Sequence, residues 1–415
     1  MNETALTDTR RRLLFAGFIV GAFALGTSEN VVAGILPNIA HGLGVTEGSA
    51  GLLVTAYAAT VTVAGPLLTM FLDGARAKRL LMWSLAVYLV GSVLAATATT
   101  FAVGLAARVL TGLVHTTVLV VFMTTAMRLA RPGKQASAAA SITLGLSLAT
   151  VLGVPIGVLL GQHVGWQAAF ALVAVLSAIS LGAVVLTFPA DEAPAEPASG
   201  NRVAGLRGLV RPPLLLGVAV TALTGMAALT LVTYVAPFLT DGAGLDRSLI
   251  VWVMLVYGIG SVVGNTAGGR LANRNVVRAM AITVTATLVV LAGLAIGATN
   301  TWVAVVLTVL VGLAYFSTFP ALNTWVATNA GEVSPILALS VNSSAFNVGI
   351  ALAGAVGGAY LDGGHSADGL PLPALVPAVL AAVLAWVLYA RYGRALAAAP
   401  AAQDAEAPVE EPTRS

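Results

Sequence analysis

Twelve long hydrophobic runs, separated by short polar segments, constrain this sequence more than any other feature. A helix needs about 20 apolar residues to cross the hydrocarbon core of a bilayer. Each run meets that length, so we expect an all-α membrane protein of twelve transmembrane helices. The runs cover approximately residues 13–36, 49–72, 80–99, 101–127, 138–160, 166–188, 213–239, 248–270, 277–298, 301–325, 335–360 and 371–391.

The composition excludes a soluble chain. Charged residues make up 9% of the sequence and hydrophobic residues 58%, whereas a soluble domain carries about 25% charged residues. The basic residues are scattered among short loops, so no nucleic-acid partner is expected. Cysteine is absent, which excludes a disulfide framework and a thiolate metal site. The run after Arg10 to Arg12 is too long for a signal peptide, so it is interpreted as the first retained span.

One polar, proline-rich segment, at residues 189–212, divides the spans six and six. We therefore expect a six-helix bundle on each side of this linker, at 13–188 and 213–391. Residues 1–12 precede the first span. The tail, 392–415, consists largely of Ala, Pro and Glu without apolar periodicity, and is expected to be disordered.

The distribution of basic residues predicts the orientation. Cytoplasmic loops carry an excess of Lys and Arg. With a cytoplasmic N-terminus, every Lys and Arg falls on the inside except Arg247, in an outside loop, and Arg108, within a span. Both termini are therefore expected to be cytoplasmic.

The two halves form a repeat with a register of 200 residues. Pro37, Tyr57 and the pair Gly112-Leu113 recur as Pro237, Tyr257 and Gly312-Leu313. Two six-helix halves in parallel repeat place a substrate site at their interface near the membrane midplane, where rocking can expose it to either side. We therefore expect two pseudo-repeated six-helix bundles with a site between them.

Two charges, Glu29 and Arg108, lie deep within spans. An acidic residue near the centre of a spanning helix costs roughly 2.5–3.5 kcal/mol, and such residues usually carry protons or hold a substrate. Span 1 runs outward and span 4 inward, so both charges lie on the outer side of the midplane at similar depth. We expect them to pair, either as a static salt bridge or as a proton switch, in which changing water access loads and unloads Glu29.

Further polar residues extend this face. Arg108, Thr111, Gly112 and His115 follow a helical stripe, and His115 can relay protons near neutral pH or act as a hydrogen-bonding core residue. Together with Thr27, Asn30 and Tyr57, Thr111 is expected to line the substrate site in the first half. The second half has Leu229, Thr308 and Tyr315 where the first has Glu29, Arg108 and His115. We expect the second half to contribute an aromatic and amide surface suited to a hydrophobic ligand with few hydrogen-bonding groups. This surface consists of Met226, Tyr234, Tyr315, Phe319 and Asn323.

Two segments are candidates for gating. Asp73 and Arg76, in the loop after span 2, are a carboxylate and a cation that can latch neighbouring helices and release them on rocking; alternatively the cations there only set orientation. In span 5, Gly153 and Gly157 allow close helix contact and Pro155 bends the span. That segment is either a packed hinge or generic membrane packing.

These motifs together resemble the major facilitator superfamily, and within it the twelve-span drug:proton antiporters close to bacterial chloramphenicol-resistance and arabinose-efflux-like permeases. The likeness covers about residues 13–391. It is carried by Gly26-Thr-Ser-Glu29, Arg108-Val-Leu-Thr-Gly112-Leu-Val-His115, Gly153-Val-Pro-Ile-Gly157, Tyr234-Val-Ala-Pro-Phe-Leu239 and Phe346-Asn347-Val-Gly.

The resemblance implies proton-driven export of a small amphiphilic drug or secondary metabolite across a bacterial plasma membrane. It implies no cofactor beyond the proton gradient and a monomer whose partners are the substrate, protons and the bilayer. A sugar or other small-metabolite efflux permease is the alternative, although the interior faces contain few of the amides and carboxylates that sugars require. No His-Glu-x-x-His, Gly-x-Ser-x-Gly or phosphate-loop motif is present, so an enzyme is not expected. A non-transporting membrane sensor is the remote alternative.

Overall fold

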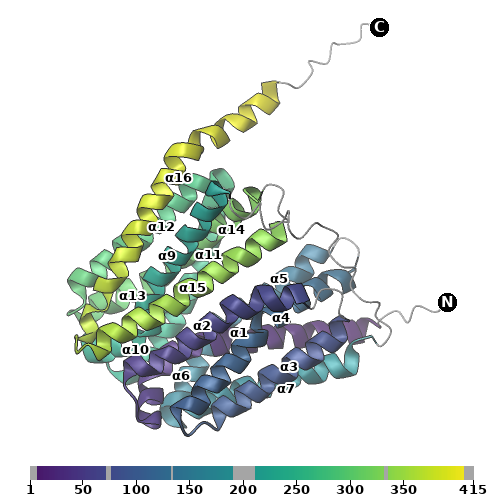
Figure 1. The fold of residues 1–415 in the computed structure, drawn as a ribbon, viewed down its shortest axis with the longest axis vertical. Helices are drawn as coiled ribbons and strands as arrows, with labels where there is room; N and C mark the ends of the chain where they lie inside the picture. Colours follow the sequence, from purple (N-terminus) through teal and green to yellow (C-terminus); the bar gives the residue numbers. More distant parts are fainter. Residues whose placement is uncertain (1–6, 72–75, 132–133, 190–210, 331–334, 406–415) are drawn as a thin grey trace, which may run out of the picture.

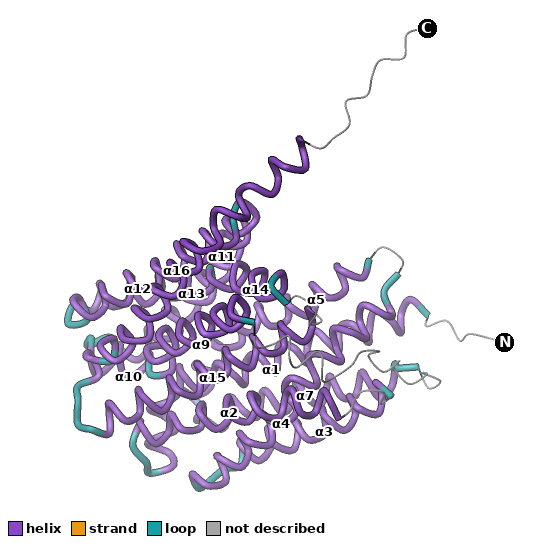
Figure 2. Tube along the Cα trace, turned by 45° about the horizontal axis from the view of Figure 1, so that its top comes forward, coloured by secondary structure: helices purple, strands orange, loops and turns teal. Residues whose placement is uncertain are grey.

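The computed structural model describes residues 7–71, 76–131, 134–189, 211–330 and 335–405. Within these residues the chain forms helices and loops only, as Figure 2 shows. The first half contains α1 Asp8–Leu43, α2 Glu47–Phe71, α3 Ala77–Ala96, α4 Phe101–Leu129, α5 Gln135–Leu148, the π-helix η1 Ala149–Gly153, α6 Val154–His163 and α7 Trp166–Thr187. The second half contains α9 Pro212–Thr233, α10 Val235–Pro237, η2 Phe238–Gly242, η3 Arg247–Leu249, α11 Ile250–Arg274, α12 Val276–Gly297, α13 Thr301–Phe316, α14 Thr318–Thr328, α15 Pro335–Asp362, η4 Ala367–Gly369 and α16 Pro371–Ala405.

Twelve of these helical stretches are long and apolar enough to cross a membrane, which confirms the predicted fold class. Three spans are interrupted. The fifth consists of α5, η1 and α6; the seventh breaks at Tyr234; and the tenth breaks between α13 and α14. The proline at the end of the first span, Pro37, lies inside a continuous α1, whereas Pro237 closes the short α10.

The packing of the helices reproduces the sequence repeat. Spans 2 and 4 (α2 and α4) pack together as spans 8 and 10 do (α11 and α13), and α1 packs on α7 as α9 packs on α16. The repeated glycines make equivalent contacts. A Cβ at Gly112 would lie 2.8 Å from the carbonyl oxygen of Tyr57, and a Cβ at Gly312 would lie 2.9 Å from that of Tyr257. The expected internal repeat therefore exists in three dimensions at the level of single contacts.

The two groups of helices meet along α2 and α15 (Figure 1). We call the end of the molecule at which α1 begins the terminal side, and the opposite end the far side. On the far side, buried apolar residues of both halves, such as Ile35, Leu36, Tyr234 and Met254, belong to one continuous core. On the terminal side the described residues form two separate cores, one around Phe18 and Phe122 in the first half, and one in the second half.

Contacts between the halves therefore concentrate on the far side. The Gln162 amide donates to the carbonyl oxygen of Arg247 at 2.7 Å, and the Thr55 hydroxyl donates to that of Ala351 at 3.1 Å. A Cβ at Gly258 would lie 2.6 Å from the carbonyl oxygen of Thr150. The halves are thus in backbone-to-backbone contact there.

The π-helix in span 5 directly precedes Pro155, where the sequence predicts a bend. Proline lacks the N–H that a regular helix would use, and its ring clashes with the carbonyl four residues earlier. In the π-turn, the N–H of Val154 donates instead to the carbonyl of Ala149, one residue further back than in an α-helix. This change of register lets the helix continue as α6.

One predicted boundary is wrong. The tail was expected to be disordered from residue 392, but α16 is helical to Ala405. Alanine is the best helix former, and Ala395, Ala397 and Ala398 lie in this extension. Most of the predicted linker, the end of the predicted tail and Asp73 lie outside the described residues.

Candidate proton and substrate site

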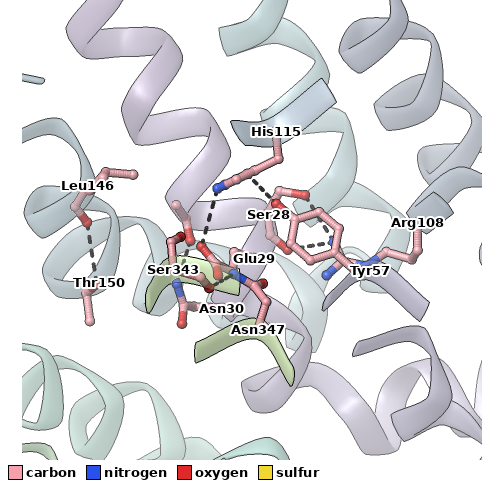
Figure 3. Close-up of polar contacts among 11 residues, drawn as sticks. Ser28, Glu29, Asn30, Tyr57, Arg108, His115, Leu146, Thr150, Ser343 and Asn347 are labelled. Carbon is pink, nitrogen blue, oxygen red and sulfur yellow. Dashed lines mark hydrogen bonds and ion pairs between the residues drawn. The ribbon is translucent and has the colours of Figure 1, made fainter. Parts of the chain in front are cut away.

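Glu29 lies on α1 with its side chain 20% exposed. Its Oε2 is 3.9 Å from Nε2 of His115 on α4, and Figure 3 shows the two side chains pointing toward each other. A charged carboxylate is costly in an apolar bundle. A neighbouring side chain that can donate or accept a proton is therefore a candidate partner for proton exchange with Glu29. The structure thus brings together two of the three residues predicted to handle protons.

His115 is connected to a second aromatic residue. The other ring nitrogen, Nδ1, is 2.5 Å from the Tyr57 hydroxyl on α2, and the rings meet edge-on, with centroids 5.6 Å apart. When the Tyr57 hydroxyl donates to Nδ1, the neutral imidazole carries its proton on Nε2, the nitrogen that faces Glu29. The hydrogen bond to Tyr57 therefore favours the His115 tautomer whose N–H points at the carboxylate.

Arg108, the third predicted residue, lies against a face of the Tyr57 ring. The guanidinium carbon is 4.0 Å from the ring centroid, within the range of a cation–π contact. Nη1 donates to the Ser28 carbonyl oxygen at 2.8 Å and to the Ser28 hydroxyl at 3.2 Å, and Nε donates to the Leu53 carbonyl oxygen at 3.2 Å. This guanidinium thereby ties α1, α2 and α4 together.

The predicted ion pair between Glu29 and Arg108 is wrong for this structure. Among the described residues, no acid lies within ion-pair distance of Arg108. Its Nη1 and Nε donate to backbone carbonyls of α1 and α2, and its Nη2 has no partner among the described residues. A chain of contacts through His115 and Tyr57 joins the two charges instead (Figure 3).

The second half presents an aromatic cluster to the same interface. The ring of Phe319 contacts those of Tyr315, Phe316 and Phe346, with centroids 5.2 to 5.4 Å apart. The Tyr315 hydroxyl is buried and finds no partner in the described part of the chain. Phe346 lies on α15, the helix that packs on α2 of the first half. The cluster, which includes the predicted Tyr315 and Phe319, therefore lies beside the interface between the halves.

A hydrogen-bonded amide group lies beside these rings. The Asn342 amide donates to Oδ1 of Asn323 at 2.9 Å, and Oδ1 of Asn342 accepts from the Thr221 hydroxyl at 2.7 Å. Asn323, which was predicted, thus accepts from Asn342, and Thr221 in turn donates to Asn342; neither of these two was predicted. Asn347, on the same helix as Asn342, is drawn with the polar cluster in Figure 3. Its buried Oδ1 accepts no hydrogen bond from any described residue.

Three residues predicted to bind substrate face elsewhere. Thr27 is buried against α5–α6, where a Cβ at Gly153 would lie 2.0 Å from its Oγ1. Thr111 packs against Gly91 of α3, and its hydroxyl donates to the Ala107 carbonyl. Tyr234 is buried between the halves on the far side, where its hydroxyl donates to the Gly354 carbonyl at 2.6 Å. Helix rotation, which short motifs do not specify, accounts for Thr27 and Thr111, whereas Tyr234 lies where the seventh span breaks.

The remaining predicted residues have simpler positions. Asn30 is half-buried next to Glu29 in the chain, and its amide donates to the Gly26 carbonyl at 2.9 Å. Met226 is half-buried on α9. Of the gating candidates, Arg76 is exposed at the start of α3, and Gly153, Pro155 and Gly157 are buried. A Cβ at Gly157 would lie 2.3 Å from a methyl group of Val31, so span 5 packs tightly on span 1.

Sequence reasoning missed Ser28, although it belongs to the motif around Glu29. A serine whose carbonyl and hydroxyl both accept from a buried arginine gives no compositional signal. Asn342 and Thr221 were missed because they have no counterpart in a known motif. Asn347 had a signal, since it lies in the quoted Phe346-Asn347 segment, but no function was attached to it.

Two repeated six-helix bundles, with a buried polar cluster facing aromatic residues across their interface, define a membrane transporter. The chain belongs to the Major Facilitator Superfamily, whose family model matches residues 18–335 and 244–414.

The chain is 33% identical to the inner membrane transport protein YdhP of Escherichia coli K12 over 368 residues, which is 89% of this chain and 94% of YdhP. It is 34% identical to a chloramphenicol resistance protein of Streptomyces lividans over 352 residues, covering 85% of this chain and 89% of that protein. The crystal structure of the nucleoside transporter NupG shares the fold, with a TM-score of 0.71 at 16% identity, over 92% of this chain and 99% of NupG.

Proposed function

We propose that this protein is a proton-coupled exporter of small amphiphilic compounds, of the chloramphenicol type, working by alternating access. The observation that carries the proposal is the position of Glu29. It is an acid within a span, one-fifth exposed and beside His115.

In the proposed cycle, proton and substrate compete for the Glu29 site. Burial disfavours the charged carboxylate, while positive charge nearby favours it. When water reaches Glu29 from one side, a proton is released there and substrate can enter. When the halves rock, protonation from the other side displaces the substrate. His115 passes the proton to and from Glu29, and Arg108 supplies fixed positive charge behind Tyr57.

The substrate site is proposed to combine apolar area with few polar contacts. Phe319 and Phe346 supply the apolar surface. The hydroxyl of Tyr315, Oδ1 of Asn347 and Nη2 of Arg108 are buried without a partner among the described residues, so they are available to a ligand. The Asn342 amide is already engaged, because it donates to Asn323 and accepts from Thr221. A ligand with one aromatic ring and two or three polar groups suits this set better than a sugar, which needs many hydrogen bonds.

The packing of the two halves supports alternating access. They share a core on the far side and have separate cores on the terminal side. With the terminal side cytoplasmic, as the basic residues indicate, this is the conformation that takes up substrate from the cell interior. The tight contacts of Gly153 and Gly157 with α1 are proposed to let span 5 move with α1 as one body.

The names of two relatives support the proposed export function. One is a chloramphenicol resistance protein, and another is an inner membrane transport protein. We place this chain accordingly in a bacterial plasma membrane, acting as a monomer that draws only on the proton gradient. Sugar efflux is the alternative function.

The test is a susceptibility panel in an efflux-deficient bacterial host. Wild type, Glu29→Gln and, as the matched control, Asp241→Asn are expressed at equal levels. Asp241 is an exposed acid on the far side, so its loss should leave export intact. We expect wild type and Asp241→Asn to raise the tolerated chloramphenicol concentration and Glu29→Gln to abolish the increase. Sugar release from preloaded cells without any drug tolerance would favour the alternative.

A further inference from the structure

A cavity of about 290 Å³ on the terminal side of the first half is lined by cations from three helix ends. Arg11 and Arg12 come from the start of α1, Arg131 follows the end of α4, and Lys134 precedes α5. It lies away from Glu29, which is about five turns further along α1, so it is separate from the transport site.

The walls of this cavity are held in place by one carboxylate. Asp8 accepts from Arg131 at 2.6 Å through Oδ2 and from Arg11 through Oδ1. The carboxylate therefore bridges α1 and the segment between α4 and α5. Among the described residues, it is the only acid in an ion pair with these four cations, so the cavity retains a net positive charge.

Apolar side chains line the cavity next to these cations. Phe15 and Ala138 line the inner part of the cavity, and both belong to the apolar core of this end of the bundle or pack against it. Leu13, on α1 next to Arg12, is 54% exposed. Hydroxyl-bearing Ser137 and Ser141 complete the lining. A ligand for this cavity thus needs a negative group and an adjoining apolar part.

We propose that this cavity binds the phosphate group of an anionic phospholipid, with the acyl chains running along the exposed part of α1. Basic cavities between membrane helices on the cytoplasmic side suit anionic headgroups, because each nearby Lys or Arg attracts the negative charge. A free phosphate would pair with the cations but would leave the apolar lining without a contact. Binding would brace the α1, α4 and α5 ends independently of the substrate.

The test uses the purified full chain in a mild detergent and counts bound lipid by native mass spectrometry. Dioleoylphosphatidylglycerol is the anionic probe, dioleoylphosphatidylcholine the zwitterionic one, and inorganic phosphate the free anion. The test variant is Arg12→Gln with Lys134→Gln, which spares the Asp8 bridge. The matched control is Arg274→Gln with Arg278→Gln, two exposed cations of the second half.

We expect wild type and the control variant to retain one more phosphatidylglycerol molecule than phosphatidylcholine, and the test variant to lose it. Melting temperatures of all three proteins without lipid show whether they are equally folded. Equal retention by test variant and wild type, or equal loss in the control variant, overturns the proposal. If millimolar inorganic phosphate displaces phosphatidylglycerol, the cavity binds a free anion, and the proposal that a lipid supplies the phosphate group is overturned.

Discussion

Nε2 of His115 lies 3.9 Å from Oε2 of Glu29, although the two residues belong to spans 4 and 1. The other nitrogen of the same ring is 2.5 Å from the Tyr57 hydroxyl on span 2. A single imidazole thus connects the membrane acid to Tyr57, whose ring stacks on the Arg108 guanidinium. Any relative movement of these three spans changes the environment of Glu29.

Replacing His115 by Gln should slow proton loading without removing the substrate site. Gln keeps polar contacts of similar reach, but it cannot take up a proton near neutral pH. We expect substrate exchange without a pH gradient to remain, and accumulation driven by a pH gradient to fall severalfold. Both are measured in proteoliposomes with radiolabelled chloramphenicol. Unchanged gradient-driven accumulation would make His115 a hydrogen-bonding core residue only.

The two functions of Tyr57 can be separated by a pair of substitutions. Tyr57→Phe keeps the ring over Arg108 and removes only the hydroxyl, whereas Tyr57→Leu removes both. We expect Tyr57→Phe to fold normally and to change the pH profile of transport. Tyr57→Leu should in addition lose the cation–π contact, worth about 2 kcal/mol when desolvated, and melt at a lower temperature. Equal melting temperatures for the two variants would contradict a structural function of the ring.

Arg108→Lys should be far from conservative. The guanidinium donates to Ser28 and Leu53 from two different nitrogens, a geometry that one ammonium cannot reproduce. A hydrogen bond to a charged group is worth about 1.5–3 kcal/mol, so losing more than one of them should lower the thermal stability in detergent strongly. Ser28→Ala, which keeps the carbonyl acceptor, should cost about 1 kcal/mol. A Lys variant as stable as wild type would contradict this assignment.

Gly258→Ala should open the far side. Its Cβ would lie 2.6 Å from the Thr150 carbonyl oxygen and 2.8 Å from Cα of Val151, where backbone meets backbone between the halves. Overpacking of this kind costs about 1–3 kcal/mol, and only in the conformation with the far side closed. Gly182→Ala is the control, since its Cβ would meet nothing within 4 Å.

The readout is labelling of a single introduced cysteine, because the natural chain has none. Met254→Cys is suitable, since Met254 is 3% exposed and faces Gly34 of the other half. A membrane-impermeant maleimide should label it faster in the Gly258→Ala background than in the Gly182→Ala background. Equal rates would mean that this contact does not hold the far side closed.

The sequence predicted the spans and the repeat because both depend on patterns that lipid imposes on every residue. Span length and the 200-residue register are properties of the chain itself. Depth could also be predicted, since it follows from counting along a helix. That is why Glu29 and Arg108 could be expected at similar depth in the bundle, and Arg108 does donate to Ser28, the residue before Glu29.

What the sequence could not provide is the direction in which a side chain points. Arg108 and Glu29 are at similar depth, yet Arg108 is directed toward backbone carbonyls rather than toward the acid. Tyrosine often binds ligands because it combines an aromatic ring with a hydroxyl group. At Tyr234, however, the seventh span breaks, and the hydroxyl donates to the Gly354 carbonyl instead. Such choices depend on helix rotation and on local breaks like the π-turn before Pro155, which involve partners far away in the sequence.

The central claim is that Glu29 exchanges its proton for substrate, and proton release on substrate binding tests it most directly. Purified wild type and Glu29→Gln are placed in weakly buffered detergent solution with a pH indicator, and chloramphenicol is added. The account predicts that wild type releases protons in proportion to bound drug, whereas Glu29→Gln binds the drug and releases none. Equal proton release from both proteins would contradict it.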